Sequence, residues 1–179
     1  MTTTHPGPKV TAVRRDDAKA KRPRLSTEQV WQEVAKASFA VVSYVTPAGE
    51  PRSSGVVYRA VDRRLYMAVG AESWKARHIA ATGRVSLTVP VRRGGLLSLV
   101  LPIPPATVSF HAAASVHPAG SQEALARLKE LGALLPTEGR ESGCVVEVVP
   151  EGEFVTYGLG VSLMDLRSPA IARARVPVM

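Results

Sequence analysis

The sequence predicts a mainly β domain in which six or seven strands form a closed barrel, with short helices between them. Segments of alternating apolar residues recur along the chain, as expected for half-buried strands. The helical segments between them are short, and the gaps between the later strands are long. This arrangement favours a closed barrel over a doubly wound sheet.

Capping and alternation signals define the first elements. Ser26, Thr27 and Glu28 predict the start of a helix that ends near Lys36. Residues 39–46 alternate and predict a strand, and the PAGEP sequence that follows predicts a turn into the next strand.

A β-hairpin is expected next, over residues 56–69. These residues are mostly β-branched, aromatic or apolar, and Asp62 with two arginines supplies the turn. Gly70 breaks the second strand of the hairpin. The pattern then becomes helical, because residues 74–82 carry apolar side chains at helical spacing and Ser73 stands at the N-cap position.

Gly83 is expected to end this helix, and a strand with two-residue periodicity follows it. Residues 107–116 predict a further strand, and residues 121–132 a capped amphipathic helix with Leu125, Leu128 and Leu131 facing inward. Residues 144–149 and 154–157 predict two more strands. The apolar stretch 96–106 is interrupted by prolines and predicts a loop that lines an interface or a substrate pocket.

Composition agrees with a soluble cytoplasmic protein. The chain has 179 residues, of which 45% are hydrophobic and 21% charged, as in an ordinary single-core domain. Its single cysteine, Cys144, lies in an apolar run and is expected to be a buried reduced thiol. No run reaches the roughly 20 apolar residues of a membrane span, and no signal-peptide pattern is present.

The net charge of +8 is concentrated near the two ends of the chain. Residues 1–25 carry +5 and are expected to be a basic tail that is disordered or docked on a partner. Residues 165–179 carry +2 and are expected to be a basic C-terminal extension, which leaves +1 for the intervening domain, residues 26–164. A nucleic-acid-binding function is therefore not favoured, because the domain shows no basic face with interleaved aromatic residues.

The start of the helix over residues 74–82 is a candidate phosphate site. A helix N-terminus presents free N–H groups and the positive end of the helix dipole. Here Ser73 adds a hydroxyl group and Lys75 adds a full positive charge.

The order of these motifs resembles a known family. A hairpin, then S-x-K at a helix start, then a strand with R-V-S-L at residues 84–87 is similar to the flavin-binding split β-barrel family of pyridoxamine 5'-phosphate oxidase. Relatives in that family use FMN or a deazaflavin such as coenzyme F420. The resemblance implies a split barrel that dimerises, with the cofactor at the subunit interface. It implies cofactor contacts at Ser54, Gly55, Val56, Val57, Ala68, Val69, Ser73, Trp74 and Lys75.

Two departures from the family pattern limit what the resemblance implies. Many relatives have arginines that grip the phosphate where this chain has Ser54 and Trp74. Arg52, on the same face of the strand as Ser54, is the residue expected to compensate. The C-terminal segment also differs from that of the oxidase, so we do not expect oxidation of pyridoxamine phosphate itself.

The expected function is that of an oxidoreductase using FMN, or alternatively a deazaflavin, on a small organic substrate. No catalytic side chain is assigned, because the flavin ring carries the redox chemistry. Trp74 is expected either to cover the ring or to pack the helix against the barrel. The apolar residues expected to wall the ring are Val56, Val57, Met67, Ala68 and Val69.

The alternative function is non-enzymatic binding of flavin or haem, with His111 and His117 on one strand face as haem contacts. A metal site is not expected, because no Cys, Asp or Glu completes a ligand set with these two residues. His78, on the helix after Lys75, is expected to be a surface or packing residue.

Overall fold

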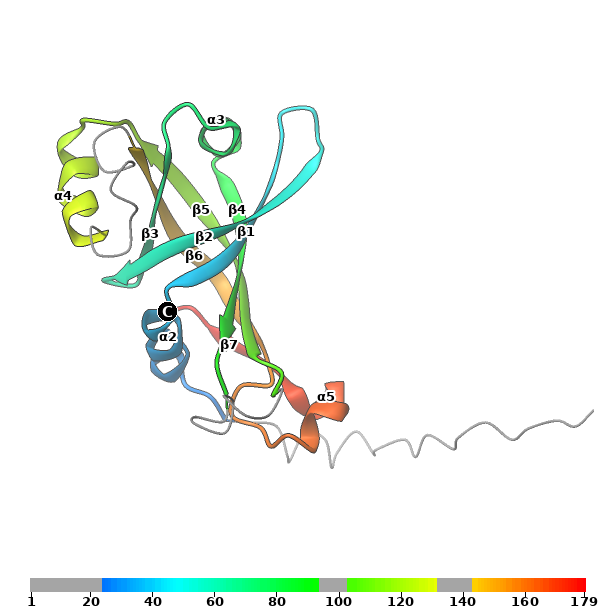
Figure 1. The fold of residues 1–179 in the computed structure, drawn as a ribbon. Coiled ribbons are helices and arrows are strands. Elements are labelled where there is room, and N and C mark those ends of the chain that lie inside the picture. Colours follow the sequence, from blue (N-terminus) through cyan, green and yellow to red (C-terminus); the bar gives the residue numbers. More distant parts are fainter. Residues whose placement is uncertain (1–23, 94–102, 132–142) are drawn as a thin grey trace, which may run out of the picture.

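The computed structural model describes residues 24–93, 103–131 and 143–179 and contains a β-barrel with short helices (Figure 1). Seven strands form one sheet in the order β3-β2-β1-β4-β5-β6-β7, and β3 also pairs with β6. Six strands therefore close into a barrel and β7 is an additional strand, which confirms the expected fold class. The strands are β1 (Phe39–Val45), β2 (Pro51–Val61), β3 (Arg64–Gly70), β4 (Arg84–Val91), β5 (Ala106–His117), β6 (Gly143–Tyr157) and β7 (Arg173–Pro177).

Four α-helices and one 3-10 turn accompany the strands in the described part of the chain. The first helix begins at a capping box in which Ser26 and Gln29 each accept a hydrogen bond from the other's backbone N–H. The turn of the β2–β3 hairpin places Asp62 and Arg63 at φ 50° and 59°, the left-handed conformation of a tight hairpin turn. The helical elements are α2 (Thr27–Lys36), α3 (Trp74–Thr82), α4 (Gln122–Leu131), η3 (Asp165–Arg167) and α5 (Pro169–Ala172).

Strand β6 corrects the expectation of two separate strands over residues 144–149 and 154–157. It runs without interruption for 15 residues, and its first half pairs with β3 while its second half pairs with β7. Its pairing with β5 shifts register between Ser109 and His111, and Gly152 takes a φ of 68° at this irregularity. Residues 150–153, which separate the two expected strands, therefore lie at a bulge inside one bent strand.

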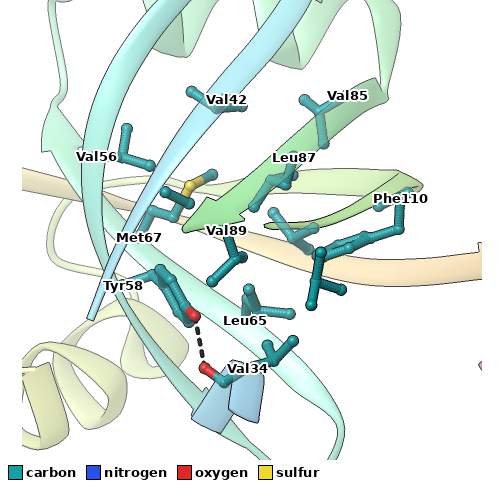
Figure 2. Close-up of a cluster of buried hydrophobic side chains, with 14 of the residues drawn as sticks. Val34, Val42, Val56, Tyr58, Leu65, Met67, Val85, Leu87, Val89 and Phe110 are labelled. Carbon is teal, nitrogen blue, oxygen red and sulfur yellow. Dashed lines mark hydrogen bonds between the residues drawn. The ribbon is translucent and has the colours of Figure 1, made fainter. Parts of the chain in front are cut away.

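The barrel interior is filled by one cluster of apolar side chains (Figure 2). Helix α2 packs Val30 and Val34 against this cluster, with no solvent exposure of either residue. The Tyr58 hydroxyl, buried in the same cluster, donates a 2.5 Å hydrogen bond to the Val34 carbonyl. Burial raises the pKa of the Tyr58 hydroxyl well above its usual value, so it stays a neutral donor that ties α2 to the barrel.

The C-terminal strand β7 is an element that sequence reasoning missed. Val176 and Val178 are buried in the core, although the segment reads as a basic extension. The indole N–H of Trp31 donates to the carbonyl of Val178 (3.1 Å), and the hydroxyl of Thr27 donates to the carbonyl of Pro177 (2.8 Å). These two hydrogen bonds therefore fix the C-terminal residues against α2.

Some expectations fall on parts of the chain that the structure does not describe. These are the tail over residues 1–23, most of the apolar loop (residues 94–102) and the side chains of Leu125, Leu128 and Leu131, and the expectations about them remain predictions. Among the described helices, none has the length and apolar character needed to cross a membrane.

Replacement of Val176 by alanine tests whether β7 is part of the core. We expect Val176→Ala to lower the free energy of unfolding by about 1.5–3 kcal/mol, because it removes buried methyl groups and leaves a cavity. Urea denaturation measures this change. Arg175→Ala is the control: its exposed ion pair with Glu153 should contribute no more than about 1 kcal/mol. Equally small effects of both substitutions would show that β7 is not packed in solution.

Candidate functional site

Helix α3 lies between β3 and β4 and covers the end of the barrel away from α2 (Figure 1). It is held there by Ala76 and Ile79, the two buried residues of the helix. Gly83 ends the helix in the left-handed conformation at φ 63° and donates from its N–H to the Ile79 carbonyl (2.8 Å). The expected helix and both of its ends are confirmed.

The N-terminus of α3 has free donors. The N-cap Ser73 accepts a hydrogen bond from the N–H of Ala76 through its side chain and from the N–H of Arg77 through its carbonyl, both at 3.2 Å. Within the described chain, the N–H groups of Trp74 and Lys75 make no hydrogen bond. These donors lie at the positive end of the helix dipole, where an anion is stabilised.

Lys75 is a half-buried cation without a counter-charge. It forms no ion pair or hydrogen bond with any described residue, and burial lowers the pKa of its ammonium group. Partial burial of an unpaired charge is unfavourable, and an anion bound beside it would remove that penalty. The site expected from the S-x-K sequence, Lys75 with the N-terminus of α3, is called the phosphate seat below and has the electrostatic character of an anion-binding site.

Ser54 on β2 is a second unsatisfied group among the residues implied by the resemblance. Its side chain lies on the inward-facing side of the strand, with Val56 and Tyr58, and its hydroxyl oxygen is buried without a hydrogen-bond partner. A buried hydroxyl without a partner is uncommon in folded proteins. The Ser54 hydroxyl makes no hydrogen bond with Lys75.

Three of the residues expected to wall a bound ring have another role. The side chains of Val56, Met67 and Val69 are buried in the barrel core, so they are not available to cover a ligand outside it. That part of the expectation is wrong, because the alternation of each strand places these residues on its inner face. Val57 is partly exposed on the outer face of β2, and Ala68 is half-buried on β3.

The outer face of β1 and β2 is apolar and open. Cross-strand register pairs Phe39 with Val57, whose side chains are 46% and 36% exposed, and pairs Val41 with Gly55. The ring of Phe39 lies over Gly55, where an added Cβ would come within 2.9 Å of it. Val45, 46% exposed, continues this strip, which no described part of the chain covers.

Trp74 does not pack α3 against the barrel, which was one of its two expected roles. It is 69% exposed, and the guanidinium of Arg77 lies 4.7 Å from its ring centre. Its indole faces a cleft whose opposite wall is the tip of the β1–β2 hairpin. Arg52, the expected substitute for a phosphate-binding arginine, lines the same cleft but forms a 2.6 Å ion pair with Glu50.

The two histidines of β5 are on one face, as expected, but have different environments. His111 is exposed, whereas His117 is half-buried and hydrogen-bonded to Glu147 (2.9 Å). Burial opposes ionisation of Glu147, but hydrogen bonds from Arg64 and His117 lower the pKa of its carboxyl below the usual value. Six strand residues span roughly 20 Å, so the two histidines are too far apart to bind one metal ion. The described residues contain no cluster of potential metal ligands.

The comparison with protein families matches residues 26–152 to the model described as pyridoxamine 5'-phosphate oxidase. The match spans more than half of the chain and includes the barrel strands β1 to β5, α3 and most of β6. The chain belongs to the pyridoxamine 5'-phosphate oxidase family. No curated protein sequence matches it significantly.

Solved structures with the same fold have different described roles. A haem storage protein, HutZ, from Vibrio cholerae superposes with a TM-score of 0.60 at 15% identity, covering 76% of this chain and 98% of that one. A haem-binding protein from Mycobacterium smegmatis gives 0.62 at 18% identity, covering 88% and 59%. A structure described as an F420 reductase gives 0.52 at 15% identity, covering 69% and 93%. Identities this low establish the shared fold alone.

Replacement of Lys75 by methionine tests whether its charge is unfavourable in the unliganded protein. We expect Lys75→Met to raise the free energy of unfolding by about 0.3–1 kcal/mol, because it removes a cation from a helix N-terminus. Since the folded-state pKa is lowered, wild-type stability should rise with pH as folded Lys75 loses its proton, and the variant should lack this rise.

Urea denaturation at several pH values measures both effects. Lys36→Met is the matched control, because Lys36 lies in the last turn of α2, where the dipole favours a cation, and pairs with Glu33 at 2.7 Å. It should give no gain in stability. Destabilisation by Lys75→Met would contradict the description of an unpaired charge.

Proposed function

We propose that this chain is an oxidoreductase that binds FMN, or alternatively a deazaflavin, and transfers hydride or electrons to or from a small organic substrate. The observation that carries the proposal is the half-buried, unpaired Lys75 beside the free N–H groups of α3. Membership of the pyridoxamine 5'-phosphate oxidase family supports the proposal. A phosphate monoester fits such a seat, because it supplies the missing negative charge and several hydrogen-bond acceptors.

The flavin ring supplies the redox chemistry when it is bound. The role of the protein would be to bind and orient. Lys75 and the N–H groups of Trp74 and Lys75 would hold the phosphate, and the backbone of residues 54–57 and 68–69 would contact the rest of the cofactor.

We further propose that the active form is a homodimer with the cofactor at the subunit interface. The support is the exposed apolar strip of Phe39, Val41, Val45 and Val57 on the outer face of β1 and β2. An apolar patch of this kind on a folded protein is typical of an interaction surface. Beside it, the Ser43 and Ser53 hydroxyls hydrogen-bond each other at 2.8 Å and so present little unsatisfied polar surface.

Non-enzymatic haem binding is the second candidate. It is supported by the haem proteins among the structural neighbours and by His111, which is exposed and lines a hollow of about 370 Å³ with Arg175 and Ser109. An exposed imidazole would suit a haem iron, whereas the arginine beside it is already paired with Glu153 at 3.1 Å. His117 is less suited, since Glu147 already occupies its Nε2.

Absorption spectroscopy of protein purified without added cofactor separates these candidates. Flavin, deazaflavin and haem bands are distinct, and we expect flavin bands, or FMN binding on reconstitution. Lys75→Ala should weaken FMN binding by roughly 1.5–3 kcal/mol, the scale of a hydrogen bond to a charged group. Lys36→Ala, an equal loss of charge far from α3, should leave affinity unchanged.

A Soret band that His111→Ala abolishes would instead establish the haem function. Unchanged FMN affinity in Lys75→Ala would remove Lys75 from the cofactor site. Failure of every cofactor to bind would refute both proposals.

The choice between FMN and a deazaflavin depends on whether further cationic side chains lie near the phosphate seat. Coenzyme F420 carries a polyglutamate chain, which favours an extended cationic surface. Arg52 is paired with Glu50, and Arg77 lies 3.8 Å from Glu72, so both arginines near α3 are partly neutralised. We therefore favour FMN.

Competition between the two cofactors at low and physiological salt tests this preference. FMN binding should depend weakly on salt, and deazaflavin binding should fall steeply as salt rises. Displacement of FMN by coenzyme F420 at both salt concentrations would reverse the choice.

A further inference from the structure

The end of the barrel away from α3 is formed by chain segments that meet there from four strands (Figure 1). The end of β4 pairs with the start of β5 through Val91 and Ala106, and the end of β6 pairs with the start of β7 through Tyr157 and Arg173. Gly158 joins the two pairs, because a Cβ added to it would lie 3.7 Å from the Ala106 backbone. We call this region the basal end, and it consists of residues 89–93, 103–108 and 157–173.

The turn that follows β6 holds two large apolar side chains in solvent. Leu163 is 49% exposed and Met164 is 72% exposed. The turn is ordered by its own hydrogen bonds: the Ser162 hydroxyl donates to the Asp165 carboxylate at 2.7 Å and accepts from the Asp165 N–H at 3.2 Å. A structured turn therefore presents both apolar side chains away from the core.

The basal end is also basic. Its residues include four arginines and a single acidic residue, Asp165. Arg93 is half-buried and donates to the Val161 carbonyl, so it fixes the turn to the end of β4. The three remaining arginines are exposed and form no ion pair with any described residue; they are Arg92, Arg167 and Arg173.

The connection between β4 and β5 adds apolar sequence to this region. It leaves the described chain after Arg93 and rejoins it at Ile103, and both of these residues belong to the basal end. The intervening residues 94–102 read GGLLSLVLP, with five large aliphatic residues and no charge. Composition and exposed side chains therefore both give the basal end an apolar character that water alone does not favour.

Unpaired arginines beside exposed aliphatic side chains fit an anionic lipid surface. Lipid phosphates and acidic headgroups attract arginine, and the boundary between headgroups and acyl chains accepts aliphatic side chains. A nucleic acid would neutralise the arginines but would offer no apolar layer to Leu163 and Met164. A lipid surface satisfies both kinds of group at once.

We propose that the basal end docks on the surface of a membrane that contains anionic lipids, with Leu163 and Met164 inserted between the headgroups and the unpaired arginines on the lipid phosphates. Docking in this orientation leaves α3 and the phosphate seat on the side of the barrel that faces away from the membrane (Figure 1). The proposal is independent of the cofactor, so its failure would not bear on the flavin function.

Co-sedimentation of the full chain with lipid vesicles tests the proposal. We expect binding to vesicles of equimolar phosphatidylcholine and phosphatidylserine, weaker binding at higher salt, and little binding to phosphatidylcholine alone. Met164→Ser should weaken binding to the mixed vesicles by roughly 3- to 10-fold, because it removes an inserting side chain. Met179→Ser is the matched control: Met179 is 96% exposed but lies at the C-terminus, outside the basal end, so its replacement should leave binding unchanged.

A charge variant tests the electrostatic part separately. Arg173→Gln should weaken binding by about 5-fold, the equivalent of about 1 kcal/mol for one cation near an anionic surface. Arg63→Gln is its control, because Arg63 lies in the β2–β3 turn and pairs with Glu28 at 3.1 Å. Met164 and Arg173 are both exposed, so these variants should keep the wild-type melting temperature.

Three results would overturn the proposal. The first is equal binding to neutral and anionic vesicles, or binding to neither. The second is unchanged binding by Met164→Ser and Arg173→Gln, which would assign any affinity for lipid to charges elsewhere, such as the basic residues 1–25. The third is a change of oligomeric state in Met164→Ser, measured by light scattering, which would assign the turn to a contact between copies of the chain.

Discussion

Pairing of β3 with β6 is the constraint on which the rest of the structure depends. Residues 65–70 of β3 pair with residues 143–148 of β6, strands far apart in sequence, and this pairing converts an open sheet into a barrel. Closure fixes the end of β3 at Gly70, and α3 begins only four residues later at Trp74. The short connection leaves α3 little freedom, so the same backbone pairing that removes two sheet edges also positions the N-terminus of the helix.

The candidate site is assembled from groups that the fold leaves unsatisfied. Lys75 is partly desolvated without a counter-charge, and the Ser54 hydroxyl is buried without a partner, whereas the polar Tyr58 hydroxyl is fully paired. A core selected for stability alone would have satisfied or replaced such groups. These groups lie at the end of the barrel covered by α3. That end is therefore the candidate binding end, whereas α2 closes the opposite end with buried apolar residues.

Sequence signals that act within a few residues were enough to predict α3 and most of the strands. They were not enough to predict contacts between segments that are far apart in the chain. Ser73, Gly83 and the turn at Asp62 act within a few residues, so their roles follow from the sequence itself. The continuity of β6 could not be predicted, because Pro150 and Gly152 resemble a turn unless the register of β5 is known. The strand near Val176 was not predicted, because the arginines around it give the segment a polar composition. The contact between the rings of Tyr44 and His78 was not predicted either, because it forms only when the barrel brings β1 close to α3. The wall expected from Val56 and Met67 failed for a related reason: strand alternation identifies two faces but not which of them is the core.

The tip of the β1–β2 hairpin is structurally independent of the barrel that carries it. Thr46 organises the tip locally: its N–H donates to the Glu50 carbonyl at 2.9 Å, its carbonyl accepts from Gly49 at 2.8 Å, and its hydroxyl accepts from the Glu50 N–H at 3.1 Å. Pro47 and Ala48 are exposed and take no part in the core. Substitution at these two positions would therefore alter the shape of the cleft without a cost in folding. In this protein the hairpin tip is therefore a place where the shape of a surface cleft can change while the barrel stays the same.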